Sequence, residues 1–234
     1  MYLYSYNYER WLERWIEMGV SCIPACEAID KERYLILRHD VDFMFDAENI
    51  SLMASLEERN SIRSSYYLII ADNYYYYNDY KSFFLELQDR GHEIGLHVNA
   101  MEISNKPWKS RSKEEAIIQL KEDMNTLIND GFNLRTMCAH GSPFKYNNKD
   151  LLSDVGKPMD FAALFSLDGC VLSDSRSRGN GLAISRNVFG DLSGKHYSIT
   201  HPHLFEWVHE EFVSIAKEIR YIEDIERSEL NRIA

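Results

Sequence analysis

Segments that look like strands alternate with segments that look like helices along this sequence, and the alternation restricts its possible folds. Each strand candidate is a short apolar run of a length that suits a buried strand. Buried strands are predicted at 34–40, 65–70, 92–97 and 135–140, and further strands lie within 161–175 and 197–201. Between these runs, apolar residues recur at spacings of three and four, as on the buried face of a helix. Helices are predicted around 8–16, 46–59, 80–87, 117–127 and 212–222.

Such alternation is typical of an α/β domain with a parallel sheet. Since we find about seven strand candidates, we favour a barrel over an open sheet. We find no change in composition that would mark a linker. We therefore predict one domain over 1–234, with 1–30 as a helical extension packed on it.

Composition limits the partners. Hydrophobic residues make up 45% of the 234 residues, enough for a globular domain with a real core. A net charge of −11 repels phosphate backbones, which argues against nucleic acid and favours a small-molecule or glycan substrate. We see no secretory leader and no run of about 18 apolar residues, so we expect a cytoplasmic protein without a membrane span. The four cysteines are expected to be reduced.

Four predicted strands end in side chains of the kinds that bind metals. These side chains are Asp40, Asp42, His97, His140 and His201. The carboxyl ends of strands in a parallel barrel share one face, where active sites are built. A carboxylate and imidazole set of this kind suits a divalent transition metal and proton transfer.

Each of these residues also has a structural interpretation. A single histidine is more often hydrogen-bonded in the core than bound to a metal. Asp40 or Asp42 could cap the helix that begins near residue 46. We assign His92 and His196 to structural positions because they begin strands. The joint pattern favours a functional site, since structural needs rarely place such residues at four strand ends.

The motifs "LRHDVDF", "GHEIGLH", "CAHGSP" and "ITHPH" resemble those of the polysaccharide deacetylases of carbohydrate esterase family four, in the branch whose first motif is HDVD. The resemblance spans residues 37 to about 207. It implies an irregular (β/α)7 barrel and metal-dependent hydrolysis of an N-acetyl or related group. The implied metal is zinc, with cobalt or nickel as alternatives.

The resemblance also implies roles for single residues. Asp40 would be the general base, Asp42 and His97 metal ligands, His201 the general acid, and Asp174 the carboxylate that supports His201. Leu204, Phe205 and Trp207 would line the pocket for the acyl methyl group. Either Arg38 or Arg176 could hold Asp40 ionised.

Two motifs depart from the family pattern. The family places a second metal histidine four residues after the first, where this chain has Met101. Its third motif is replaced by Cys138 to Pro143. We hypothesise that His140 supplies the missing ligand; Asn99 or Glu102 is a weaker alternative. We therefore expect an amide hydrolase, most simply a deacetylase of an N-acetylated sugar or glycan in surface-polysaccharide metabolism. The alternatives are an inactive, deacetylase-like binding or regulatory protein and an unrelated barrel metal enzyme such as a phosphoesterase.

Overall fold

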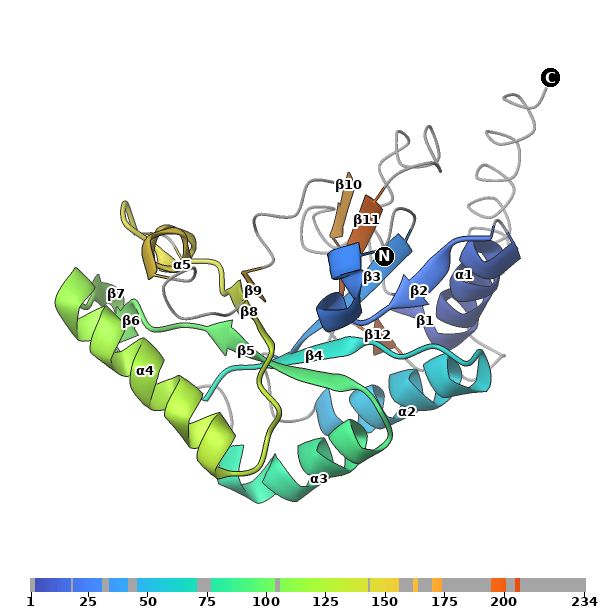
Figure 1. Ribbon diagram of the computed structural model, residues 1–234, viewed down its shortest axis with the longest axis horizontal. Coiled ribbons are helices and arrows are strands. Elements are labelled where there is room, and N and C mark those ends of the chain that lie inside the picture. The colour runs from blue at the N-terminus through green and yellow to red at the C-terminus, as the bar shows by residue number, and fades with distance from the viewer. Residues whose placement is uncertain are drawn as a thin grey trace.

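The computed structural model describes residues 3–17, 19–30, 34–41, 46–70, 77–103, 106–142, 144–155, 162–163, 170–173, 195–200 and 205–206. The centre of the fold is one sheet of eight strands in which every pairing is parallel. Its strands are β2 (Ser21–Ile23), β3 (Tyr34–Val41), β4 (Ser65–Leu68), β5 (Glu93–Val98), β8 (Thr136–Ala139), β9 (Ala162–Ala163), β10 (Cys170–Ser173) and β11 (Lys195–Thr200). The predicted α/β class with a parallel sheet is confirmed (Figure 1).

The strand order is β10-β11-β3-β4-β5-β8-β9, with β2 beside the first half of β3. Among the described residues, no pairing joins β9 to β10, so the (β/α)7 barrel stays a prediction. Two small pairs lie outside this sheet. The first joins β1 (Leu3–Tyr4) to β12 (Phe205–Glu206), and the second joins β6 (Glu102–Ile103) to β7 (Lys106–Ser110).

Four of the predicted helices are present at the expected places. They are α1 (Ser5–Glu17), α2 (Asp46–Arg59), α3 (Tyr77–Asp89) and α4 (Lys113–Asn129). The predicted helix around 212–222 lies outside the described residues. A short helix, α5 (Asn148–Val155), and a 3-10 segment, η1 (Ala25–Asp30), were not predicted. No helix in the described part of the chain is long and apolar enough to cross a membrane.

Local chemistry explains where α4 begins and ends. Ser112 accepts a hydrogen bond from the Glu115 amide, and the Glu115 carboxylate accepts one from the Ser112 amide, which forms a capping box. After the helix, Gly131 has a φ of 99°, a conformation that glycine adopts without the steric cost of a Cβ atom.

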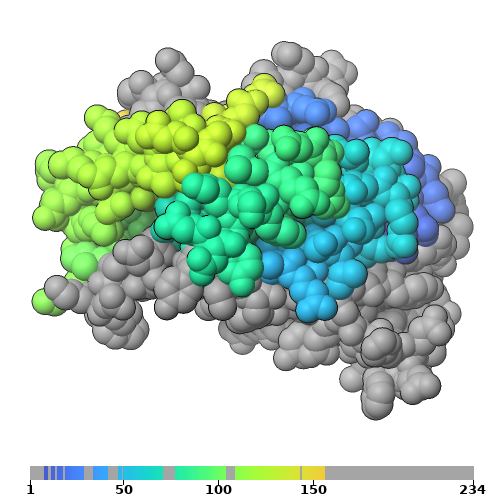
Figure 2. Space-filling model, turned by 90° about the horizontal axis from the view of Figure 1, so that it is seen from below, coloured from blue at the N-terminus to red at the C-terminus, as the bar shows by residue number. Residues whose placement is uncertain are grey.

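The two faces of the sheet have different chemistry. Helices α2, α3 and α4 cover one face, where the larger hydrophobic core contains Ile50, Leu68, Phe84, Leu96 and Leu120. Figure 2 shows the outer surfaces of these three helices side by side. A smaller core of Ile23, Ala25, Ala28, Tyr34, Ile36, Tyr67 and Cys138 lies on the other face. Because successive strand residues point to opposite faces, this second face also receives Arg38 and Asp40.

A buried polar cluster on the helix-covered face accounts for two histidines. Glu57 of α2 is fully buried, and one of its carboxylate oxygens lies 2.6 Å from Nε2 of His39. It also accepts hydrogen bonds from the hydroxyls of Tyr8, Ser64 and Tyr66. Burial alone would raise the pKa of Glu57, but the charge and hydrogen bond of His39, together with His92 and Ser64, outweigh that effect and lower the pKa to about 2.

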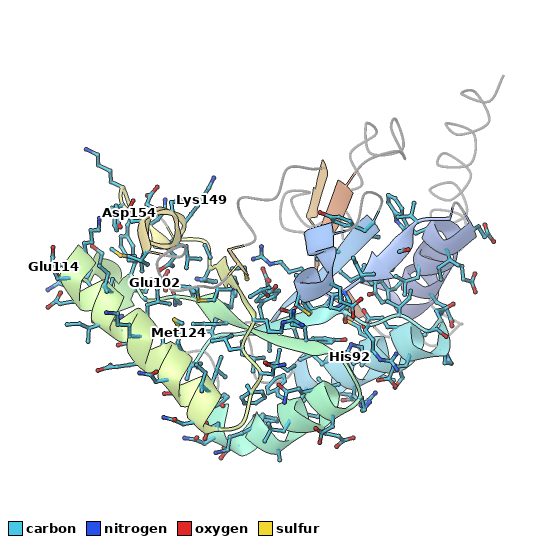
Figure 3. All side chains as sticks on the ribbon, in the orientation of Figure 1. His92, Glu102, Glu114, Met124, Lys149 and Asp154 are labelled. Atoms are coloured by element: carbon cyan, nitrogen blue, oxygen red, sulfur yellow. The ribbon has the colours of Figure 1, made fainter. Side chains whose placement is uncertain are left out.

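His92 belongs to the same cluster. Its Nδ1 accepts a hydrogen bond from the Ser64 amide at 3.2 Å and lies 3.8 Å from the Glu57 carboxylate. The residue comes just before β5, whereas Glu102 comes after it, and Figure 3 shows these two labelled side chains beyond opposite ends of the strand. The structural assignment made for His92 therefore fits its position.

Candidate metal centre

Asp40 forms a buried ion pair with Arg38, two residues before it on β3. Nε of Arg38 donates to Oδ1 of Asp40 at 2.6 Å, and Nη2 donates to Oδ2 at 2.8 Å. The pair forms because residues two apart on a strand point to the same face. Both side chains are buried, with 7% of Arg38 and 3% of Asp40 exposed. Of the two arginines considered from the sequence, Arg38 thus holds Asp40, while Arg176 lies outside the described residues.

The guanidinium of Arg38 is supported from the neighbouring strand. Its central carbon lies 5.6 Å from the ring centroid of Tyr67, within range of a cation–π contact. Burial lowers the pKa of Arg38, but the Asp40 carboxylate more than compensates and raises the pKa above its usual value. The guanidinium therefore stays charged and favours the ionised form of Asp40.

His97 joins Asp40 from β5. Its Nε2 lies 3.5 Å from Oδ2 of Asp40, and its Nδ1 lies 3.1 Å from the sulfur of Cys138. The sulfur is 3.9 Å from Oδ1 of Asp40. His97 and Cys138 are direct neighbours in the parallel pairing of β5 with β8. All three side chains are buried, and each offers a donor atom within 4.8 Å of the others.

This donor set fits a divalent transition metal. It contains one carboxylate oxygen, one imidazole nitrogen and one sulfur, all of which bind zinc in proteins. Metal bonds of about 2.0–2.3 Å place neighbouring ligand atoms of a tetrahedral site about 3–4 Å apart. The observed separations of 3.1, 3.5 and 3.9 Å are of this size; His97 meets Cys138 through Nδ1 and Asp40 through Nε2, and one metal ion would bind only one of these nitrogens.

His140 stands beside this group and is not one of its three members. Its ring centroid is 5.1 Å from that of His97, and the two rings are nearly perpendicular, at 85°. Its Nδ1 lies 3.9 Å from a carboxylate oxygen of Glu102. The weaker candidates Asn99 and Glu102 are hydrogen-bonded to each other at 3.0 Å.

Met101 lies on the other side of the sheet. Its side chain is buried in the larger hydrophobic core, and its amide donates to Oδ1 of Asn148 at 2.9 Å. Asn148 also donates to Oδ1 of Asn99 and to the main-chain oxygen of His140. Asn148 thus ties the segment after β5 to the segment after β8, and the sequence position expected to carry a second histidine packs as an apolar residue.

Several predicted site residues lie outside the described residues. These are Asp42, Asp174, His201, Leu204 and Trp207; the main chain of Phe205 is described in β12, but its side chain is not. Of the catalytic and metal positions predicted from the sequence, the structure brings Asp40 and His97 together and places His140 next to His97.

Cys138 is the residue that sequence reasoning missed. The sequence predicts only that its thiol is reduced, as for the other three cysteines. The available signal was its place in "CAHG", two residues before His140, which predicts that both side chains face the same way if the strand runs through 135–140. Its contact with His97 depends on the register between β5 and β8, and that register is a property of the fold.

Comparison with known proteins relates the fold to one family of enzymes. No protein-family model matches this sequence, and no curated protein is detectably similar to it. The structure, however, has an α/β fold similar to that of a CE4 family protein. That protein is a mutant of BA3943, described as a CE4 family pseudoenzyme with restored enzymatic activity.

The similarity to this mutant has a TM-score of 0.50 at 11% sequence identity. It covers 83% of this chain and 64% of the other, so this chain spans less than two thirds of that protein's length. The wild-type pseudoenzyme from Bacillus anthracis matches with a TM-score of 0.49 and 12% identity over 83% of this chain and 62% of its own. The likeness is one of fold.

Proposed function

We propose that this protein is a CE4-type, metal-dependent hydrolase that cleaves a carbon–nitrogen amide bond, with the N-acetyl group of a sugar or glycan as its substrate. The observation that carries the proposal is the buried Arg38–Asp40 pair next to His97, on the polar face of a parallel sheet. A buried carboxylate is costly unless it has a partner, so a charged pair at this place indicates a functional role. The chain would be one (β/α)7 barrel domain over 1–234.

In this proposal Asp40, although its carboxylate lies close to the donor atoms of His97 and Cys138, acts as the general base and not as a metal ligand. It accepts a proton from the water that attacks the amide carbonyl, and Arg38 keeps its carboxylate ionised beforehand. His201 then gives a proton to the departing amine, with Asp174 supporting it. A positioned acid or base of this kind contributes typically about 10²–10⁴-fold to the rate.

The metal would be held by Asp42, His97 and a donor from the end of β8, for which the sequence favours His140. Zinc suits this set, and cobalt or nickel are alternatives. A bound divalent metal supplies Lewis acidity, which polarises a carbonyl and lowers the pKa of a water molecule. The main-chain amides of Gly141 and Ser142, after β8, are proposed to stabilise the oxyanion.

We also propose a cellular setting, for which the sequence is the only support. A cytoplasmic deacetylase with a strong negative charge would act on a small-molecule or glycan substrate in surface-polysaccharide metabolism. We propose neither nucleic acid nor a membrane as a partner.

The experiment is acetate release from N-acetylglucosamine oligomers, measured with metal-loaded protein and with its Asp40→Asn variant. The proposal predicts turnover in the wild type and a loss of about 10²-fold or more in the variant, which keeps its metal. Equal turnover in both proteins would remove Asp40 from its role.

A second candidate function is a non-catalytic protein that keeps the fold for binding or regulation. The burial of Met101 in the apolar core favours this alternative, because the chain then lacks the second histidine of the family pattern. A wild-type protein that binds no metal and releases no acetate would support it.

A further inference from the structure

We propose that Cys138 binds the metal as a thiolate and supplies the ligand that Met101 cannot. This inference rests on the proposed function, because it concerns the same metal centre. It replaces the choice of His140 that the sequence favoured, and it makes the centre a site of mixed oxygen, nitrogen and sulfur donors.

Position is the first argument. The sulfur of Cys138 lies 3.1 Å from Nδ1 of His97 and 3.9 Å from Oδ1 of Asp40. Within the described part of the chain, these three residues offer donor atoms that lie close together. The pairing of β5 with β8 fixes Cys138 directly beside His97. A ligand held on a strand is placed more precisely than one on a loop, and His140 follows the end of β8.

Burial is the second argument. Cys138 is 1% exposed, whereas the side chain of His140 is 18% exposed. Nδ1 of His140 lies 3.9 Å from a carboxylate oxygen of Glu102. Two ring centroids 5.1 Å apart in a perpendicular arrangement describe packing of one imidazole on the other. His140 therefore packs edge-on against His97 and is more exposed than Cys138, which is fully buried.

Charge is the third argument. Arg38 already places a positive charge in this buried region, balanced by Asp40. A divalent cation adds two more positive charges, and an uncompensated buried charge is strongly unfavourable. A thiolate ligand compensates one of these charges, which a neutral imidazole from His140 cannot do; the thiol proton leaves to solvent as the metal–sulfur bond forms.

A thiolate ligand also selects the metal. Soft sulfur donors favour zinc, cobalt and cadmium over magnesium, calcium and manganese, which prefer oxygen donors. We therefore expect zinc and cadmium to displace cobalt from the centre, while a large excess of magnesium does not.

Cobalt(II) spectroscopy tests the inference. A thiolate bound to cobalt(II) gives an intense near-ultraviolet charge-transfer band in addition to the weaker visible bands of the ion. We expect this band in the wild type and in His140→Ala, and its loss in Cys138→Ser. The matched control is Cys22→Ser, which should keep the band; Cys22 lies in β2, and burial together with the charge of Glu57 raises the pKa of its thiol to about 12.

The outcomes separate this inference from the proposed function. Visible cobalt bands without the charge-transfer band in the wild type would overturn sulfur ligation and leave the metal centre intact. Retention of the band in Cys138→Ser would overturn it as well. Absence of any bound cobalt would overturn both proposals. X-ray absorption of the zinc-loaded wild type gives the same decision without a variant, since sulfur ligation predicts a Zn–S distance of about 2.3 Å.

Discussion

Arg38 and Asp40 stand two residues apart on β3 and form two parallel hydrogen bonds, at 2.6 and 2.8 Å, on the polar face of the sheet. This paired geometry is the strongest form of an arginine–carboxylate contact. It places the Asp40 carboxylate, the proposed general base, next to His97 and Cys138.

Removing the arginine should destabilise the protein markedly. In Arg38→Met, the Asp40 carboxylate stays buried without the guanidinium that balances it. Breaking a buried pair in this way costs about 3–5 kcal/mol of unfolding free energy. Urea denaturation at neutral pH would measure the loss.

A surface arginine provides the control for this variant. Arg59 pairs with Glu9 at 3.0 Å, but 63% of its side chain is exposed. Exposed pairs contribute less than about 1 kcal/mol, so Arg59→Met should have little effect. Equal losses in the two variants would contradict the special role of the Arg38–Asp40 pair.

Stability should fall at low pH because of Glu57. The pKa of Glu57 is about 2 in the folded protein, below an ordinary value of 4.5, so its contribution is present above pH 4.5 and is lost as the pH falls toward 2. By linkage, the wild type should lose about 2 kcal/mol from this group between pH 7 and pH 3. Glu57→Gln cannot take up this proton, so urea unfolding at several pH values should show a shallower decline in the variant. Parallel declines in both proteins would rule out Glu57 as the source.

Gly95 should not tolerate a side chain. A Cβ atom at this position would lie 2.4 Å from the Tyr67 ring and 2.9 Å from the main-chain oxygen of Thr136. The ring would have to leave its contact with Arg38 and its 2.5 Å hydrogen bond to Thr136. Overpacking of this kind costs about 1–3 kcal/mol, measurable as a lower unfolding midpoint of Gly95→Ala.

Gly141 is the matched control for Gly95. A Cβ atom there meets nothing within 4 Å, and its φ is not positive. We expect Gly141→Ala to change the unfolding free energy by less than about 0.5 kcal/mol. A loss as large as that of Gly95→Ala would mean that the close approach to Tyr67 is not what excludes a side chain at Gly95.

A histidine at position 101 should not create a metal ligand. Met101 packs in the larger hydrophobic core, away from the Asp40 face, so Met101→His buries an imidazole among apolar side chains. This should lower the unfolding free energy by about 1–3 kcal/mol and leave metal affinity no higher than in the wild type. Met101→Leu, the apolar control, should cost less than about 1.5 kcal/mol. Tighter metal binding by the histidine variant would show that position 101 can reach the centre.

The sequence predicted those parts of the fold that are strongly periodic. The predictions for α2, β3 and β5 succeeded because long apolar patterns and distinct turns mark them. Helix α5 was missed because its eight residues, "NKDLLSDV", are mostly polar and too short to show a helical repeat. The hairpin of β6 and β7 was missed because its strands show no clear alternation.

The predictions for the site were likewise successful in part. The apolar run that begins at Tyr34 placed Asp40 and Asp42 at the end of a strand, and the "GHEIGLH" motif pointed to His97. Which arginine pairs with Asp40, and which donor at the end of β8 serves as a metal ligand, depend on three-dimensional neighbours, so the sequence left the first open and favoured His140 for the second. The structure pairs Arg38 with Asp40 and brings both Cys138 and His140 against His97.

Metal content per chain tests the central claim most directly. The wild type and His97→Ala should be purified without a chelator or a histidine tag, loaded with zinc and analysed by elemental mass spectrometry. The account predicts about one zinc ion per wild-type chain and its loss in the variant, because His97 is the imidazole of the centre. A wild type that holds no zinc, or a variant that holds as much as the wild type, would contradict it.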